Sequence, residues 1–207
     1  MSDVTTTPRG DATRAAILDT AEHLFRTMGY QKTAVADIAR ELRMSPANVY
    51  RFFASKSAIC EAICQRLLTG LSEQAWAVAR SPGTAEHRLR ALFVMMQART
   101  MELFFADKRM HDMVAAALDE HWAIIKQHVH AIDTALRHIV IDGQEAGHFA
   151  RLDPGATGKL LHNMILVFTH PQMIEECREP DDLPQMAADM AELALRALRQ
   201  NPTTDGS

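Results

Sequence analysis

Apolar residues recur every three or four positions along most of the chain, which is the spacing of one face of an α-helix. The first such stripe contains Ile17, Ala21, Leu24 and Met28, and it ends at Gly29, a residue that commonly terminates helices. No segment shows the alternating pattern of a strand, so the sequence predicts an all-α fold. The expected helices cover residues 11–28, 34–42, 46–52, 55–80, 84–103, 107–114, 122 to the region 143–147, 154–169 and 184–199.

Residues that favour helix N-termini stand at the start of several of these segments. Thr33, Ser45, Ser55, Thr84 and Asp153 each carry a side-chain oxygen that can accept a hydrogen bond from a first-turn N–H group. Pro residues follow at positions 46 and 154, where the missing N–H group is of no consequence. These five residues are therefore predicted to be N-caps.

The two short segments at residues 34–42 and 46–52 are joined by only a few residues. This spacing is typical of a helix-turn-helix motif, in which the second helix presents its first residues to the DNA major groove. Helical hairpins without DNA function have a similar spacing. If Val49 and Phe53 are buried, however, the polar side chains between them must face outward.

Several outward side chains of this segment suit DNA. Asn48 and Arg51 can form hydrogen bonds with base edges, whereas Tyr50, Ser55 and Lys56 suit phosphate oxygens. The alternative is that Arg51 and Lys56 belong to an ordinary solvated face.

With its neighbouring stripes, this segment resembles the DNA-binding head of the tetracycline-repressor (TetR) family. The matching positions are Arg14, Ile17, Leu18, Ala21, Leu24, Phe25, Gly29, Tyr30, Thr33, Ile38, Ala39, Ser45, Tyr50, Phe53, Ser55, Lys56 and Ser57. Arg43 stands where the family usually has a glycine, so the turn is expected either to carry some strain or to adopt a different conformation. Ala36 and Ala47 are small where some members place longer base-reading side chains, so few side chains should read bases directly.

The resemblance implies an N-terminal three-helix head followed by a helical effector-binding and dimerisation domain. It also implies a homodimer, a double-stranded pseudo-palindromic operator as partner, and a small-molecule effector. The expected division is a flexible arm at 1–10, the DNA-binding domain at 11–56, the effector and dimer domain at 57–200 and a disordered tail at 201–207. The expected DNA contacts are Thr33, Ala36, Ser45, Pro46, Ala47, Asn48, Tyr50, Arg51, Ser55 and Lys56.

Composition adds little to this interpretation. The net charge is −4, but residues 1–56 carry +2 and residues 57–207 carry −6, which fits a head that binds an anion or arises by chance. No apolar run is long enough to span a membrane, and no secretory signal is evident, so a cytoplasmic location is expected. The three cysteines are interpreted as small buried hydrophobes, with a redox sensor as the alternative.

The C-terminal two-thirds is rich in methionine and aromatic residues, which suit a pocket for an apolar or aromatic molecule but also an ordinary core. Arg99 falls on an apolar seam, where it must pair with an acid, reach water or meet a bound anion. The hypothesis is that it anchors the effector. The expected effector residues are Met96, Arg99, Thr100, Leu103, Met113, Trp122, Ile125, Val129, Met164 and Phe168.

Other chemistry is not expected. Ten histidines are present, but none has zinc-site spacing, and neither a phosphate-binding loop nor a nucleophile motif occurs, so no metal, cofactor or enzyme activity is predicted.

The last two helices lead to a dimerisation hypothesis. Small side chains on one face of the helix at 184–199 let another helix approach closely, and bulky side chains on the helix at 154–169 supply a partner face. The alternative is packing within one chain. The predicted interface residues are Leu161, Met164, Phe168, Ala187, Met190, Ala194 and Ala197.

Together these features predict a ligand-responsive repressor that an apolar or aromatic effector releases from DNA. The alternatives are a regulator whose effector promotes DNA binding or activates transcription, and a helical small-molecule binding protein without DNA function.

Overall fold

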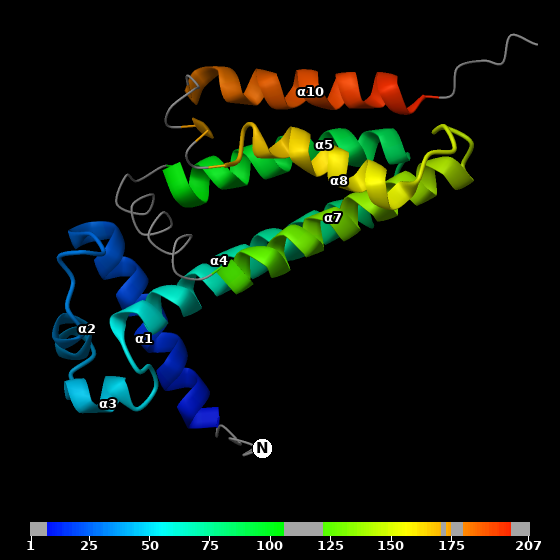
Figure 1. The fold of residues 1–207 in the computed structure, drawn as a ribbon. Coiled ribbons are helices and arrows are strands. Elements are labelled where there is room, and N and C mark those ends of the chain that lie inside the picture. Colours follow the sequence, from blue (N-terminus) through cyan, green and yellow to red (C-terminus); the bar gives the residue numbers. More distant parts are fainter. Residues whose placement is uncertain (1–7, 106–121, 171–172, 175–179, 200–207) are drawn as a thin grey trace, which may run out of the picture. The chain divides into compact units, whose positions relative to one another are not determined.

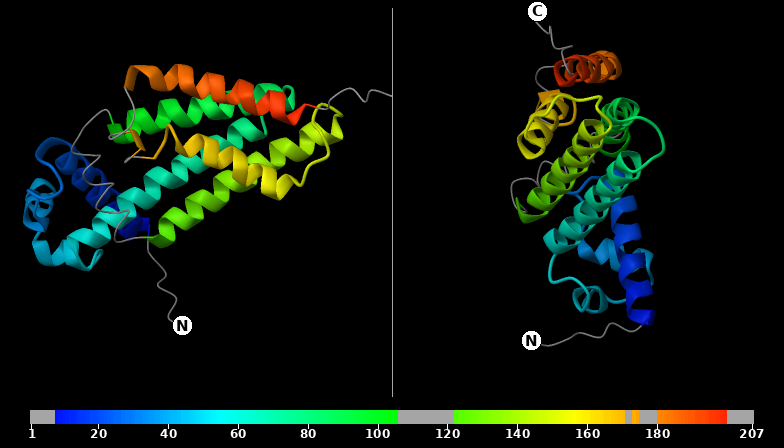
Figure 2. Two further views of the ribbon diagram at one scale, coloured as in Figure 1. Left: turned by 45° about the horizontal axis from the view of Figure 1, so that its top comes forward. Right: turned by 90° about the vertical axis from the view of Figure 1, so that its right-hand side faces the viewer.

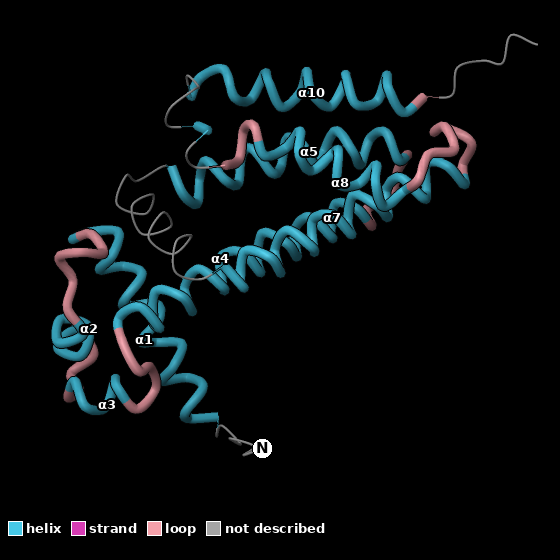
Figure 3. Tube along the Cα trace, viewed as in Figure 1, coloured by secondary structure: helices cyan, strands magenta, loops and turns pink. Residues whose placement is uncertain are grey.

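The computed structural model describes residues 8–105, 122–170, 173–174 and 180–199. This part of the chain is built from helices, as the apolar spacing predicted (Figures 1 and 3). Within it, extended pairing is limited to one bridge between Phe149 and Arg199. The chain divides into two compact units, one reaching from the N-terminus to Leu67 and one containing residues 68–103 and those from Ala123 onward. The predicted tail and most of the predicted arm lie outside the described residues. Residues 8–10, which were expected to belong to the arm, are instead the start of the first helix.

The first unit is a small helical head. It contains α1 (Pro8–Met28), α2 (Val35–Glu41), α3 (Pro46–Tyr50) and the beginning of α4 (Lys56–Ala79). Apolar side chains from all four helices share its core, including Ile17, Phe25, Ile38, Val49, Phe53, Ile59 and Ile63. Helices as short as α2 and α3 are marginal alone, so this shared core is what stabilises them.

An ion-pair network joins α1 to α4 within the head. The guanidinium of Arg66 on α4 donates hydrogen bonds to Asp19 at 2.5 Å and to Glu22 at 2.6 Å. Glu22 also pairs with Arg26 at 2.9 Å. Burial lowers the pKa of Arg66, but the two carboxylates outweigh burial and raise it. The network fixes the first turns of α4 against α1.

The second unit consists of the remainder of α4 and the helices that follow (Figure 2). These are α5 (Ala85–Thr100), which continues as a π-helical turn (Met101–Phe105), α7 (Trp122–Glu145), α8 (Pro154–Leu166), a 3₁₀ turn (Pro180–Asp182) and α10 (Leu183–Leu198). Helix α10 packs along α5 and also contacts α8. Across the residues that can be described, no helix is long and apolar enough to cross a membrane.

Most of the predicted N-caps are confirmed. The side chains of Ser45, Ser55, Thr84 and Asp153 each accept a hydrogen bond from the N–H group three residues later. The prediction for Thr33 is wrong, because α2 is capped at Ala34, whose N–H group donates to the Asp37 carboxylate.

A buried arginine fixes the C-terminal end of α4 in the second unit. Arg88 on α5 donates hydrogen bonds to the Ala79 carbonyl and to the Asp142 carboxylate, both at 2.7 Å. Its side chain is only 10% exposed, so loss of the Asp142 carboxylate would leave a buried charge without a counter-ion. The last turn of α4 is thereby tied to α5 and α7.

Helices α7 and α8 approach each other closely at Gly158. A Cβ atom added there would lie 3.0 Å from the Asp133 carbonyl oxygen and 3.1 Å from the Arg137 nitrogen, both backbone atoms. Backbone cannot move aside as a flexible side chain can, so the absence of a side chain at Gly158 sets the distance between the two helices.

Replacing Gly158 with alanine is therefore expected to destabilise the protein by about 1–3 kcal/mol, because α7 and α8 must move apart. The control is Gly155→Ala in the same helix, where the added Cβ makes only an ordinary contact with Asp153. Urea unfolding followed by circular dichroism measures both. A Gly158→Ala protein as stable as the Gly155→Ala protein would contradict the close-packing argument.

Candidate nucleic-acid interface

The turn between α2 and α3 has the left-handed backbone conformation that favours glycine, since Arg43 has a φ angle of 52°. Its N–H group donates to the Arg40 carbonyl at 3.1 Å, and the Met44 N–H group donates to the Ala39 carbonyl at 2.9 Å. These two bonds form a Schellman motif, whose left-handed position is usually glycine. A side chain in this conformation costs about 1–2 kcal/mol relative to a right-handed helical one.

Helix α3 separates buried from exposed side chains as predicted. Its N-cap is Ser45 and its first residue is Pro46. Val49 and Phe53 are buried, whereas Ala47, Tyr50 and Arg51 are exposed. The half-buried Asn48 places its amide nitrogen 3.6 Å from the sulfur of Met44. The exposed side chains form a polar surface on the first turns of α3 and just beyond them.

Two predicted DNA contacts on neighbouring elements have different surroundings. Ala36 is exposed on α2. Thr33 is 1% exposed, and its hydroxyl donates to the Gly29 carbonyl at 2.9 Å. The prediction that Thr33 contacts DNA is therefore wrong for this conformation, because its side chain closes the end of α1 instead.

Lys56 connects the start of α4 to the loop after α1. Its ammonium donates to the carbonyls of Tyr30, at 2.9 Å, and Gln31, at 3.4 Å, and lies 4.5 Å from the centre of the Tyr30 ring. Tyr30 in turn meets Phe25 edge to face, with ring centres 5.2 Å apart. One of the three ammonium N–H donors remains for another acceptor.

The cations of the head fall into two groups. Five are engaged inside the head: Lys56 at the loop after α1, Arg14 at 4.7 Å above the Phe53 ring, and Arg26, Arg40 and Arg66 in pairs with carboxylates. The hydrogen bond from Ala34 and the pairing with Arg40 lower the pKa of Asp37. Within the described part of the chain, Lys32, Arg43 and Arg51 form neither ion pairs nor ring contacts. These three exposed charges flank α2 and α3.

The predicted effector residues do not share one environment. Met96, Thr100 and Phe168 are buried, and Phe168 stacks obliquely on Phe93 with ring centres 6.0 Å apart. The half-buried members are Leu103, Ile125, Val129 and Met164. Met113 and the side chain of Trp122 lie outside the described residues.

Arg99 was expected to pair, reach water or anchor an effector, and it forms an ion pair with Glu102 one turn later. The Arg99 side chain is 34% exposed, although its Nε atom is buried without a protein acceptor. The ion pair with Glu102 thus balances the charge of Arg99 without a bound anion.

A partly buried polar contact between α4 and α7 was not foreseen. Ser72 Oγ lies 2.9 Å from His128 Nδ1, and the Ser72 hydroxyl donates to the Leu68 carbonyl. With its proton used there, Ser72 accepts from the Nδ1–H group of His128. Burial first, and the charge of His162 second, lower the pKa of His128 to about 4. Periodicity could not reveal this pair, because its members are distant in sequence.

His162 lies on α8 and is also buried. Its Nδ1 atom is 2.6 Å from the Asp133 carboxylate. Among the described residues, no group of three or more potential ligands is arranged to hold a metal ion.

The predicted dimer residues are mostly turned into the core of their own chain. Leu161, Phe168, Ala187 and Ala194 are all nearly inaccessible. The alanine face of α10 packs within the second unit, so assigning these four residues to a dimer interface is wrong. Met164 and Met190 are half-buried, and Ala197 is exposed.

Two family models match the chain over most of its length. The model described as bacterial regulatory proteins of the tetR family matches residues 17–63. The model described as the tetracyclin repressor-like C-terminal domain matches residues 85–190. Comparison with curated proteins gives no match.

Solved structures share the fold. A transcriptional regulator from Cytophaga hutchinsonii is 18% identical with a TM-score of 0.73, covering 92% of this chain and 100% of that one. A TetR-family regulator from Pectobacterium atrosepticum is 19% identical with a TM-score of 0.73, covering 95% and 99%. SmeT, the repressor of the Stenotrophomonas maltophilia multidrug efflux pump SmeDEF, is 19% identical with a TM-score of 0.66, covering 94% and 96%.

The lowered pKa of His128 predicts an acid-sensitive second unit. Its ordinary pKa of 6.5 applies when the chain is unfolded, so the unfolded chain binds a proton more readily than the folded one. The contribution to stability is therefore complete above pH 6.5 and is lost as the pH falls toward 4, by about 3 kcal/mol in total. In His128→Gln this loss should disappear.

Urea unfolding between pH 7 and pH 4 measures the effect. The matched control is His130→Gln, at an exposed position of the same helix. If His128→Gln and the unmodified protein lose the same stability over this range, the assignment to His128 is wrong.

Proposed function

Since the chain belongs to the TetR family of bacterial regulatory proteins, we propose that it is a transcriptional repressor that leaves a pseudo-palindromic DNA operator when a small apolar effector binds. Members of this family are generally DNA-binding regulators rather than enzymes. The observation that carries the proposal is the exposed polar surface of α3, with Arg51 at its C-cap, which the buried side chains of Val49 and Phe53 turn toward solvent.

The head would recognise DNA with few side chains. Arg51 is exposed and uncommitted among the described residues, and Asn48 is partly exposed beside it, so both can reach base edges. Tyr50 is 51% exposed and suits a phosphate oxygen. Lys56 has one donor left for a second phosphate, because its other two hold the loop carbonyls. Ala36 and Ala47 would allow close approach without reading a base.

The effector would bind in the second unit, among α4, α5, α7 and α8. Its surroundings would be the apolar side chains of Met96 and Phe168, with Thr100 as a buried polar group. Arg99 is taken up by Glu102, which favours an apolar or aromatic effector over an anion. Leu103, Ile125, Val129 and Met164 complete the proposed lining, with Met113 and Trp122 proposed from sequence alone.

Release from DNA would require that the effector prefer a conformation in which the two heads no longer fit successive major grooves. A difference in binding free energy of about 1–3 kcal/mol between the two conformations is typical of such coupling. Helix α4 is the element through which we propose the coupling. It is hydrogen-bonded to α7 through Ser72 and ion-paired to α1 through Arg66.

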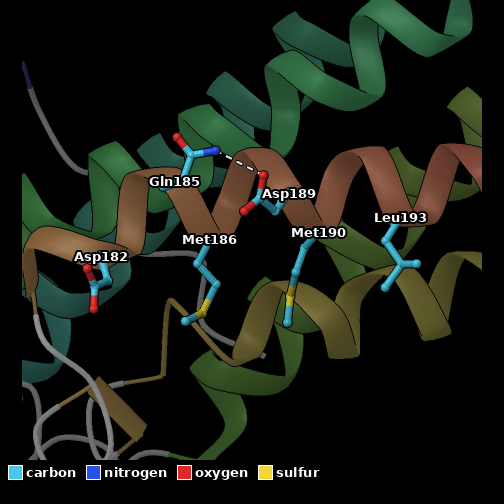
Figure 4. Close-up of a pocket in the computed structure, with 6 residues that line it drawn as sticks. All are labelled: Asp182, Gln185, Met186, Asp189, Met190 and Leu193. Carbon is cyan, nitrogen blue, oxygen red and sulfur yellow. Dashed lines mark hydrogen bonds between the residues drawn. The ribbon is translucent and has the colours of Figure 1, made fainter.

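The family forms dimers, and we propose that the outward face of α10 joins two copies of this chain. Figure 4 shows Met186, Met190 and Leu193 pointing to one side of α10, with Gln185 and Asp189 placed away from them. Together with Asp182 they line a groove of about 380 Å³. Leu193 is 61% exposed, and Leu160 on the neighbouring α8 is 65% exposed. Ala197, with half-buried Met164, would extend this apolar surface.

Binding of the protein to DNA duplexes should weaken steeply with added salt, because its Lys and Arg side chains displace counterions from the DNA phosphates. Arg51→Ala is expected to lower affinity for a selected operator about tenfold. Fluorescence anisotropy measures both effects, with Arg196→Ala, an exposed cation on α10, as the control for net charge. Absence of salt-sensitive binding to any duplex would contradict the proposed function.

Leu193→Glu should separate the dimer, since one carboxylate from each copy would be placed in the apolar interface. Sedimentation equilibrium measures the mass, and Val94→Glu, which alters an exposed apolar residue of α5, serves as the control. A Leu193→Glu protein that stays dimeric at the same concentrations as the unmodified chain would exclude this face of α10.

A further inference from the structure

The turn between α2 and α3 keeps a residue type that its backbone conformation disfavours. Arg43 is exposed, and at a φ angle of 52° it occupies the left-handed position of the Schellman motif. Both hydrogen bonds of the motif use backbone atoms alone, so glycine would form them equally well. Whatever Arg43 provides at this position must therefore come from its side chain.

The Arg43 side chain does not stabilise the head through its charge. In the described part of the chain its guanidinium meets neither a carboxylate nor an aromatic ring. Arg40, only three residues earlier and also exposed, pairs with Asp37 at 2.7 Å. The protein therefore neutralises the charge of Arg40, whereas the charge of Arg43 is available to a partner.

The position of Arg43 indicates what that partner is. It lies just before Ser45, the N-cap of α3, and outside the helix whose side chains face the bases. Residues that flank a recognition helix lie where the sugar-phosphate backbone borders the major groove. A guanidinium is well suited to a phosphate, because its N–H groups match the phosphate oxygens in pairs.

We propose that Arg43 binds a DNA phosphate beside the recognition helix. An arginine at this position then lowers the folding stability of the protein and raises its affinity for DNA. The proposal rests on the proposed DNA-binding function. It adds a contact from the turn itself, and it predicts that stability and affinity respond in opposite directions when Arg43 is replaced by glycine.

The experiment compares Arg43→Gln, Arg43→Gly and Arg40→Gln in the full-length chain. Arg43→Gln removes the charge but keeps a side chain in the strained conformation, whereas Arg43→Gly removes both. Arg40→Gln removes an equal charge that the protein already neutralises. Each variant is melted and titrated with salt on a mixed-sequence DNA duplex about three helical turns long and on a selected operator.

We expect the slope of log affinity against log salt to fall by about one for each bound head in both Arg43 variants. The affinity should fall by a similar factor, about five- to tenfold, on both duplexes, because a phosphate contact is independent of sequence. Arg40→Gln should change the slope by less than half as much. The melting temperature should rise by about 1–3 °C in Arg43→Gly and stay unchanged in Arg43→Gln.

Three results would overturn the proposal. The first is an unchanged salt slope in Arg43→Gln, and the second is a loss of affinity confined to the selected operator, which would indicate a base contact. The third is a lowered melting temperature in Arg43→Gly, which would show that the turn is not strained. If the proposed DNA-binding function itself is wrong, the unmodified chain will show no salt-sensitive binding to DNA, a result different from these three.

Discussion

Burial of Val49 and Phe53 is the constraint on which the proposed DNA surface depends. Helix α3 has five residues, too few to be stable alone in water. Its orientation is therefore set by these two apolar side chains and by the Ser45 cap. Once Val49 faces the core, Ala47, Tyr50 and Arg51 must face outward. The side chains of Val49 and Phe53 thus both stabilise α3 and determine which of its residues face the proposed DNA.

The cationic side chains of the head have two different roles: some stabilise the fold, and others remain available to a partner. The cations with partners fix one helix to another, as Arg66 does for α4 and α1, or fix a loop, as Lys56 does at Tyr30. Among the described residues of the head, the exposed cations that form no ion pair or ring contact are Lys32, Arg43 and Arg51, and all three flank α2 and α3. The net charge of residues 1–56 is only +2. The positions of these three cations are therefore a better indication of a polyanionic partner than the net charge of the head.

Local signals in the sequence predicted local structure well. The caps at Ser45, Ser55, Thr84 and Asp153 were foreseen because each depends on a few neighbouring residues. Thr33 was misassigned because two adjacent residues could both begin α2, and only the fold shows that its hydroxyl closes α1. Helix α10 has apolar side chains on two faces, and spacing cannot decide which one meets α5. The alanines fit against α5, which leaves Leu193 outside.

The most direct test of the account is selection of DNA from a random duplex library by the full-length chain. A dimer that presents two α3 helices should enrich a pseudo-palindrome whose half-sites are centred about one helical turn, or a whole number of turns, apart. Few specified bases are expected in each half-site, because Ala36 and Ala47 leave base reading mainly to Asn48 and Arg51. Enrichment of an asymmetric site, or of no site at all, would contradict the account.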